Sequence, residues 1–198
     1  MDIVVNNLNK KYGDKIILDN YYEVFKNNTI SFIMGPSGVG KTTLIRILMG
    51  LEKADSGEVT GMEDKKISAV FQEDSLCRNL SVYLNIKLVN EDISDIEIEN
   101  ALKQMDLYDY MYKRVDELSG GMKRKVAILR AILCDFDLLI MDEPFKGLDT
   151  ETKSKVMSYL INNLKNKTAI IITHNIDEVK YFEDSKEITT IHKMLDNY

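Results

Sequence analysis

The chain has no tryptophan and only two prolines, two cysteines and two histidines among its 198 residues. Two isolated cysteines, Cys77 and Cys134, are too few for a disulfide framework or a zinc site, so we interpret both as reduced packing residues. The scarcity of proline argues against a long extended linker, and 44% hydrophobic residues are typical of a globular protein. A chain of this length is expected to form one domain that buries roughly 70% of its unfolded surface.

Basic residues are fewer than acidic residues, which limits the classes of partner that the chain can bind. The chain has 26 Lys and Arg residues against 32 Asp and Glu residues, a formal net charge of -6. Because nucleic-acid binders need a basic stripe to displace counterions, we predict no nucleic-acid partner. The start, MDIVVNNLNKK, lacks the basic and apolar regions of a signal peptide, and no run reaches the length of a membrane span. We therefore expect a cytoplasmic protein.

Four short apolar runs are predicted to form buried strands. They are TISFIM (29–34), ISAVF (67–71), DLLIM (137–141) and TAIIIT (168–173), and they lead into Gly35, Gln72, Asp142 with Glu143, and His174. Parallel strands bring their carboxyl ends to one edge of a sheet, where open α/β sheets bind ligands. We expect a glycine loop, an amide, two acids and an imidazole to surround one crevice at that edge.

Two further regions differ from this α/β core. IVVNNL, IILDNYYEV and the strand at 29–34 predict an antiparallel β layer, with Asn27-Asn28 supplying the positive φ of a turn. SVYLNIKLV and DIEIENALKQMDLYDYMYKRV have helical spacing, and the second places acids early and bases late, as a helix dipole favours. We predict one domain over 1–198, with a core of 1–75 and 118–198 and a helical subdomain at 76–117.

The stretch GPSGVGKTT (35–43) fits G-x-x-x-x-G-K-[ST] between a strand and an apolar helix, the context that this pattern requires. Its fixed residues recur by chance at roughly 1 in 30,000 positions. Backbone N–H groups of 38–42 would surround phosphates, Lys41 would reach the β and γ oxygens, and Thr42 would offer a hydroxyl to Mg²⁺. The predicted nucleotide-binding residues here are Gly35, Pro36, Ser37, Gly38, Val39, Gly40, Lys41, Thr42 and Thr43.

The other strand ends carry candidate catalytic groups. Asp142 would hold Mg²⁺ through water, and Glu143 would orient or deprotonate the water that attacks the γ-phosphate, although two solvated acids are the plainer alternative. A neutral His174 could bond the γ-phosphate or that water, or it could be only a polar cap. Gln72 could contact metal-bound water or be a solvated loop residue. His192 has no comparable position, and we expect it at the surface.

A second glycine pair lies in LSGGMKRKV (118–126), at the predicted start of a helix. Ser119 is a good N-cap, but Gly120 and Gly121 are poor helix formers. Three basic residues follow without an acid, which opposes the helix dipole, and an arriving anion would remove the conflict. A Ser-capped helix with a solvated basic face is the alternative.

In order, GPSGVGKTT, VFQED, LSGGM, LLIMDEPFKGLD and ITHN resemble the motifs of the ATP-binding subunits of ABC transporters over nearly the whole chain. The resemblance implies a P-loop NTPase of the RecA-like type, an α/β core of mainly parallel sheet with an N-terminal antiparallel β layer and a helical subdomain insertion. Its cofactors would be ATP and Mg²⁺. Lys41, Gln72, Glu143 and His174 would be catalytic, and Thr42, Gln72 and Asp142 would serve the metal.

The same resemblance assigns roles to residues for which the spacing alone indicates none. Tyr12 would stack on adenine, although a half-exposed aromatic in a β layer is the alternative. Gln72 corresponds to the lid glutamine, Asp149 to a loop that links the two sites of a dimer, and His174 to the switch histidine. In the head-to-tail dimer of this family, Ser119, Gly120 and Gly121 of each copy would cap the ATP held by the other copy's loop.

The resemblance also implies partners. ATP hydrolysis would power transport through integral membrane permease subunits, contacted around Gln72 and 73–90, with the chain peripheral on the inner face of the cell membrane. VFQEDSL, LSGGM and DEPFKGLD are more specifically similar to the nitrate, sulfonate and taurine branch of importers, which also uses an extracytoplasmic solute-binding protein. Met122 and Gly147 depart from the commonest residues of the superfamily. The chain ends about 24 residues after His174, so we expect a compact ATPase without a regulatory tail.

Other functions fit parts of this pattern. An exporter subunit or a non-transport ABC ATPase shares the motifs, although non-transport members usually add coiled coils, paired cassettes or basic surfaces. A P-loop kinase or GTPase has no place for LSGGM, and no guanine-reading Asn-Lys-x-Asp occurs. An inactive nucleotide-binding module is disfavoured by intact Lys41, Glu143 and His174.

Overall fold

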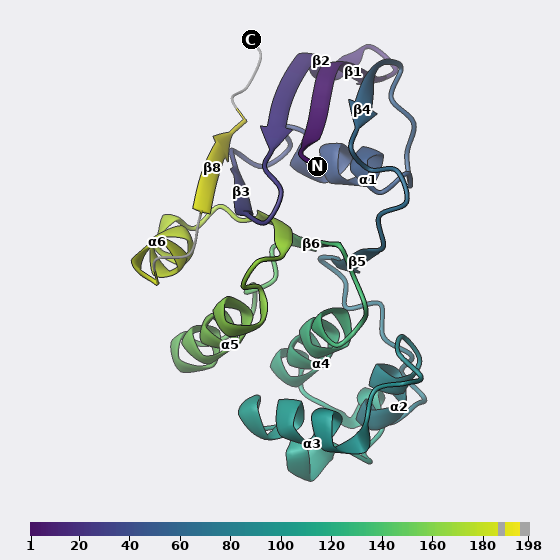
Figure 1. Cartoon of the computed structure of the whole chain (residues 1–198), viewed down its shortest axis with the longest axis vertical. Helices are drawn as coiled ribbons and strands as arrows, with labels where there is room; N and C mark the ends of the chain where they lie inside the picture. The colour runs from purple at the N-terminus through teal and green to yellow at the C-terminus, as the bar shows by residue number, and fades with distance from the viewer. Residues whose placement is uncertain (186–188, 195–198) are drawn as a thin grey trace.

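The computed structural model describes residues 1–185 and 189–194 and contains two β-sheets, of which the antiparallel one lies toward one end of the molecule (Figure 1). A parallel sheet has the order β5 (Ile67–Val70), β6 (Leu138–Asp142), β7 (Thr168–Ile172), β3 (Ile30–Met34) and β8 (Thr189–Lys193). An antiparallel sheet has the order β2 (Lys15–Phe25), β1 (Ile3–Tyr12) and β4 (Ser56–Thr60). The predicted α/β fold class is confirmed.

Six helices and two short 3₁₀ turns connect these strands within the described residues. They are α1 (Lys41–Leu48), α2 (Val82–Lys87), α3 (Asp95–Gln104), α4 (Gly120–Ile132), α5 (Thr150–Asn163) and α6 (Ile176–Asp184), with turns at Tyr108–Tyr110 and Val115–Glu117. Figure 1 shows α4, α5 and α6 on one side of the parallel sheet, and α1 with the antiparallel sheet on the other. Over residues 1–185 and 189–194, no helix is long and apolar enough to cross a membrane.

Side-chain alternation along the buried strands divides the interior into two cores. Leu139 and Met141 of β6 pack in a cluster with α4, α5 and α6, whereas Leu138 and Ile140 pack in a second cluster with α1, β1 and β2. All five residues of β6, and all five of β7, are buried, as expected for strands covered on both faces. The sheet edge that carries the candidate residues is therefore fixed from both sides.

The predicted antiparallel layer exists, but its third strand is β4 and not the strand at 29–34. β3 lies in the parallel sheet between β7 and β8, because its first four residues are all buried and need cover on both faces. Asn28 does have a positive φ, of 55°, but its turn leads from one sheet into the other. β4 pairs with β1, and Gly57 lies at an irregularity in this pairing, where a Cβ would be only 2.3 Å from the carbonyl oxygen of Asn7.

The helix predicted over residues 95–115 ends earlier than the periodicity suggests. Its N-terminus is stabilised by a reciprocal capping box between Ser94 and Glu97. Asp106 then adopts a left-handed φ of 52°, and the N–H of Leu107 donates to the carbonyl of Leu102 at 2.8 Å. This turn closes α3 at Gln104, as left-handed residues commonly do at helix ends.

Two single-residue expectations were wrong. His192 lies on β8, where its side chain is only 9% exposed and its Nδ1 is 2.9 Å from Glu23 Oε1, so it is not a surface residue. Its ring also packs against Phe25, with 4.8 Å between ring centroids. Cys77 is exposed in the loop before α2 and so does not serve packing, whereas Cys134 is partly buried.

Candidate functional site

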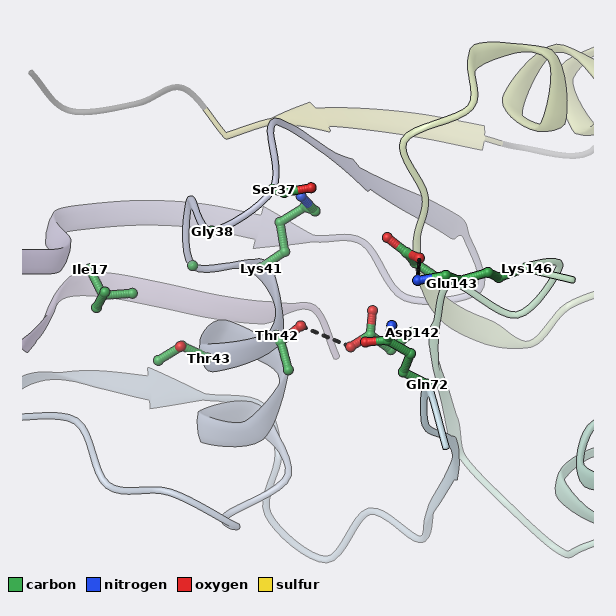
Figure 2. A pocket seen from close by; sticks show the side chains of 11 residues that line it. Ile17, Ser37, Gly38, Lys41, Thr42, Thr43, Gln72, Asp142, Glu143 and Lys146 are labelled. Carbon is green, nitrogen blue, oxygen red and sulfur yellow. Dashed lines mark hydrogen bonds and ion pairs between the residues drawn. The ribbon is translucent and has the colours of Figure 1, made fainter. Parts of the chain in front are cut away.

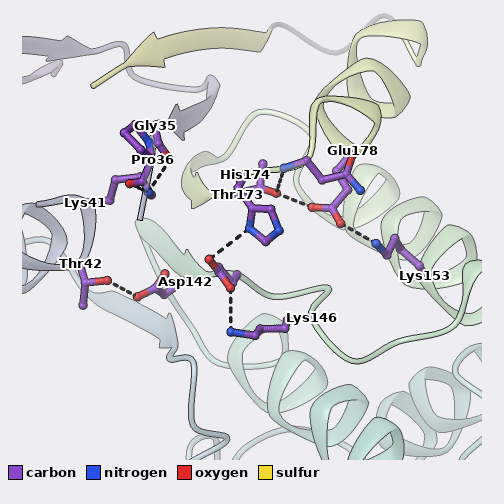
Figure 3. A network of polar contacts seen from close by, with 12 residues as sticks. Gly35, Pro36, Lys41, Thr42, Asp142, Lys146, Lys153, Thr173, His174 and Glu178 are labelled. Atoms are coloured by element: carbon purple, nitrogen blue, oxygen red, sulfur yellow. Dashed lines mark hydrogen bonds and ion pairs between the residues drawn. The ribbon is translucent and has the colours of Figure 1, made fainter. Parts of the chain in front are cut away.

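The loop between β3 and α1 wraps the N-terminus of α1. Gly40 is the N-cap with a φ of 109°, and a Cβ there would lie 2.8 Å from Ile17 Cγ2, so only glycine fits. Because α1 begins at Lys41, the N–H groups of its first turn and the positive end of the helix dipole make this helix end suited to an anion. The buried Lys41 donates its Nζ to the carbonyls of Gly35 and Pro36, both at 2.7 Å (Figure 3).

A cavity of about 280 Å³ opens beside this loop (Figure 2). Its lining comes from the loop and α1, from the end of β6 and the residues that follow β5 and β6, and from β2. The lining residues are Ile17, Ser37, Gly38, Gly40, Lys41, Thr42, Thr43, Gln72, Asp142, Glu143 and Lys146. The structure thus brings the predicted glycine loop, amide and two acids to one crevice at the carboxyl edge of the sheet.

Thr42 and Asp142, one hundred residues apart, meet inside this cavity. The Thr42 hydroxyl donates to Asp142 Oδ2 at 2.9 Å. Burial raises the pKa of Asp142 above its usual value; the Thr42 hydrogen bond opposes this, and the neighbouring Glu143 charge adds to it. Gln72 lines the same cavity from the end of β5. These three side chains offer the oxygen atoms that Mg²⁺ prefers, so the predicted metal-binding residues fit that ion.

Glu143 leaves β6 in a strained conformation that directs its carboxylate into the cavity. Its φ is 46°, a left-handed value that costs a non-glycine residue about 1–2 kcal/mol. His174 Nδ1 is 3.3 Å from Oε1, and Lys146 Nζ is 3.3 Å from Oε2 on the opposite side (Figure 3). Burial raises the pKa of Glu143, but Lys146 and His174 outweigh it and hold the pKa below its usual value. The carboxylate is therefore ionised at neutral pH and able to accept a proton.

His174 reaches Glu143 from the residue pair that follows β7. Its side chain is 68% exposed, but the residue before it is anchored, because the Thr173 hydroxyl donates to the buried Glu178 at 2.6 Å. Lys153 of α5 donates to the other oxygen of Glu178 at 2.7 Å. A second cavity of about 220 Å³ lies between these residues and shares Glu143 and Lys146 with the first.

The second glycine pair lies apart from this cavity. Ser119 caps α4 by accepting the Met122 N–H at 3.3 Å, and residues 119–121 are not among the described residues that line the cavity. A Cβ on Gly120 would meet nothing within 4 Å, and one on Gly121 would make an ordinary contact of 3.6 Å with Leu148. Neither glycine has a positive φ. The packing of the described residues therefore gives no reason for glycine at these positions.

Several other predicted residues also lie outside the cavity lining, namely Gly35, Pro36, Val39, His174, Tyr12 and Asp149. Tyr12 ends β1 and is 49% exposed, and its hydroxyl donates to Glu52, which raises the pKa of Tyr12. Lys10 lies over the Tyr12 ring at 5.2 Å from the centroid. Asp149 caps α5 by accepting the Thr152 N–H at 2.9 Å. Stacking by Tyr12 and a linking role for Asp149 stay predictions.

Sequence reasoning did not predict that two cations, Lys146 and Arg124, belong to the surroundings of the cavity. Lys146 pairs with Glu143 from three residues further on, a spacing that is informative only once the turn after β6 is known. Arg124 is buried beneath the ends of β5 and β6. Its position, four residues before Ile128 and seven before Ala131, lies on the buried face of α4, and this periodicity could have revealed it.

Comparisons with known proteins agree with this geometry. A family model described as ABC transporter matches residues 18–146, more than half of the chain. A spermidine/putrescine import ATP-binding protein of Acetivibrio thermocellus is 32% identical over 92% of this chain and 57% of its own length. A probable sulfate/thiosulfate import ATP-binding protein of Chlorella vulgaris is 31% identical over 90% of this chain and 83% of its own length.

An iron(III) import ATP-binding protein of Photobacterium profundum is 31% identical over 92% of this chain and 57% of its own length. The chain thus spans little more than half the length of several curated relatives that it matches. Among solved structures, a bacterial Atm1-family ABC exporter with ATP bound superposes with a TM-score of 0.79 at 26% identity, covering 90% of this chain and 35% of the exporter. The family match and these relatives show that the chain belongs to the ABC transporter family.

Proposed function

We propose that this chain is the ATP-binding subunit of an ABC importer and hydrolyses ATP to drive a small solute through a separate membrane permease. The observation that carries this proposal is the cavity in which Lys41, Thr42, Asp142 and Glu143 converge on the N-terminus of α1. Phosphate oxygens suit that helix end, and the Glu143 carboxylate would face the attacking water. The exporter and non-transport alternatives share this cavity, and the import proteins among the relatives favour import.

Nucleotide binding follows from the loop. Its N–H groups and Lys41 would hold the β- and γ-phosphates, with the Lys41 ammonium moving from the carbonyls of Gly35 and Pro36 to phosphate oxygens. Thr42, Asp142 and Gln72 would hold Mg²⁺, which when bound neutralises charge on the β and γ oxygens. Tyr12 would stack on adenine from the end of β1.

Hydrolysis follows from the pair at the end of β6. Glu143 would accept a proton from the water, or orient it, as the water oxygen bonds to the γ-phosphorus. The bond between that phosphorus and the bridging oxygen breaks, and ADP and phosphate leave. His174 and Lys146 lie on opposite sides of the carboxylate and would keep it in the cavity.

A second copy of the chain would complete each site. Ser119, Gly120 and Gly121 stand at the exposed start of α4, whose first turn has no acid, so this helix end can receive an anion. Because the described residues give no packing reason for the glycine at 120, we infer that glycine is needed for close approach to the ATP of the second copy.

The transport partners belong to the same proposal. Residues 76–117 would form the helical subdomain, and the segment 73–90, where Leu84 and Leu88 are exposed, would contact permease subunits at the inner face of the cell membrane. An extracytoplasmic solute-binding protein would deliver the solute to the permease. The sequence motifs VFQEDSL, LSGGM and DEPFKGLD support a solute of the nitrate, sulfonate or taurine type.

Thr42→Ala tests the metal part of the site. We expect this variant to lose at least about tenfold in affinity for ATP when Mg²⁺ is present, because one oxygen ligand is gone. In EDTA its affinity should equal that of the wild-type chain, since the backbone donors of the loop remain. Lys41→Met is the matched comparison and should weaken ATP binding under both conditions. Fluorescence titration with a labelled ATP analogue measures both, and equal Thr42→Ala losses with and without Mg²⁺ would refute the metal assignment.

Purification from membranes tests the import assignment. We expect the tagged chain to bring down an integral membrane permease, and substitution of both Leu84 and Leu88 by Glu to release it while ATP binding is retained. Mass spectrometry of the bound proteins identifies the permease and so the class of solute. Recovery of ribosomal or DNA-repair proteins in place of a permease would favour a non-transport ATPase.

A further inference from the structure

Arg124, in the second turn of α4, is a buried cation that bridges two strand ends of the candidate site. It is only 4% exposed, and its guanidinium makes hydrogen bonds to two separate segments of the chain. A buried charge is often no more stabilising than an apolar residue even when its donors are satisfied, so a buried arginine here suggests a role beyond filling space. Gln72 and Glu143 follow the same two strand ends.

The first set of contacts holds the turn after β6. Arg124 Nε donates to the carbonyl of Pro144 at 2.9 Å, and Nη2 donates to the carbonyls of Glu143 at 2.6 Å and Asp142 at 3.2 Å. Three consecutive carbonyls therefore bond to one guanidinium. The left-handed φ of Glu143 is a strained conformation that persists only when its surroundings determine it, and these bonds supply that constraint.

The second set of contacts holds the turn after β5. Arg124 Nη1 donates to the carbonyl of Phe71 at 2.5 Å and to Asp74 Oδ1 at 3.1 Å, and it lies 3.4 Å from the carbonyl of Gln72. The planar guanidinium presents its donors in a fixed fork, so one rigid group sets the spacing between the two turns. A lysine ammonium has three donors and cannot span both sets.

We propose that Arg124 is a positioning residue for hydrolysis, which fixes the backbone that carries Glu143 relative to the backbone that carries Gln72. This inference rests on the proposed ATPase function. Arg124 itself is not among the described residues that line the cavity, so it acts through the two turns and not by contact with ATP. Without the guanidinium hydrogen bonds, the Glu143 carboxylate moves from the position that hydrolysis requires. The loop at 35–43 keeps its own contacts.

Arg124→Met and Arg124→Lys test this role in the full chain, with Arg130→Met as the matched control. Arg130 is on the same helix and donates to the carbonyl of Ser75 at 3.1 Å, but no bond to the turn after β6 is found for it among the described residues. For each variant, steady-state phosphate release gives kcat and KM, titration with a labelled ATP analogue gives Kd, and thermal unfolding gives Tm.

We expect Arg124→Met to lower kcat by about 100-fold and Arg124→Lys by about tenfold, because small misplacements of a catalytic group have effects of that size. Nucleotide Kd should stay within about twofold of the wild-type value for both, and Arg130→Met should keep kcat within about twofold. If Arg124→Met fails to fold, Arg124→Lys provides the test by the same criterion, a lowered kcat with an unchanged Kd.

An Arg124 variant that folds and retains the wild-type kcat overturns the inference. So does a variant that weakens ATP binding by as large a factor as it lowers kcat, because that result shows a general structural role. Absence of turnover in the wild-type chain would refute the proposed function and this inference with it, so the two failures can be told apart.

Discussion

Glu143→Gln is expected to reduce ATP turnover by at least about 100-fold, the scale of losing a general base. The amide keeps the size of the side chain but cannot accept a proton, and it loses the ion pair with Lys146. The affinity for ATP should stay within about twofold, because the loop at 35–43 supplies the phosphate contacts. Phosphate release and nucleotide titration measure the two quantities separately.

Glu99→Gln is the control for this substitution. Glu99 pairs with Lys103 on α3, outside both candidate cavities, so its replacement should leave kcat unchanged. If Glu143→Gln hydrolyses ATP as fast as the wild-type chain, the assignment of the attacking-water position to this carboxylate is wrong.

Gly120→Ala is expected to separate stability from activity. The added Cβ meets nothing within 4 Å, and alanine is favoured over glycine inside helices by up to about 1 kcal/mol, so Tm should stay constant or rise. ATP turnover should nevertheless fall by at least about tenfold, because the Cβ would stand between the start of α4 and the ATP of a second copy. Thermal unfolding and phosphate release on the same preparation measure both.

The affinity of the chain's own loop for ATP provides the internal control. Residues 119–121 are not among the described residues that line the cavity, so ATP binding to a single copy should be unchanged in Gly120→Ala. Normal turnover in this variant would show that the glycine pair does not approach a nucleotide.

The buried strands and the phosphate loop could be predicted because their signals are local. β6 and β7 are continuous apolar runs, and the parallel pairing that brings their ends together follows from the alternation of strands with helices. The loop at 35–43 and the acids at 142 and 143 are recognisable from residue types alone. The cavity that contains Lys41, Thr42, Asp142 and Glu143 was therefore predictable in outline.

The features that sequence reasoning missed depend on distant residues. β4 is recognisable only through its pairing with β1, and β8 has few apolar residues because it lies at the sheet edge beside β3. The end of α3 depends on one left-handed residue, Asp106, within a continuing helical period. Helical periodicity could have shown that Arg124 is buried, but the roles of Arg124 and Lys146 depend on the turn after β6 that they contact.

Two copies of this chain are proposed to share each ATP between the loop of one copy and the glycine pair of the other. Light scattering of Glu143→Gln tests this most directly, because ATP persists on a chain that cannot hydrolyse it. With ATP and Mg²⁺ the mass should be twice the 22.7 kDa of one chain, and adding Gly120→Ala should return it to one chain. A Glu143→Gln protein that stays monomeric with ATP, or that is equally dimeric without nucleotide, would contradict the shared site.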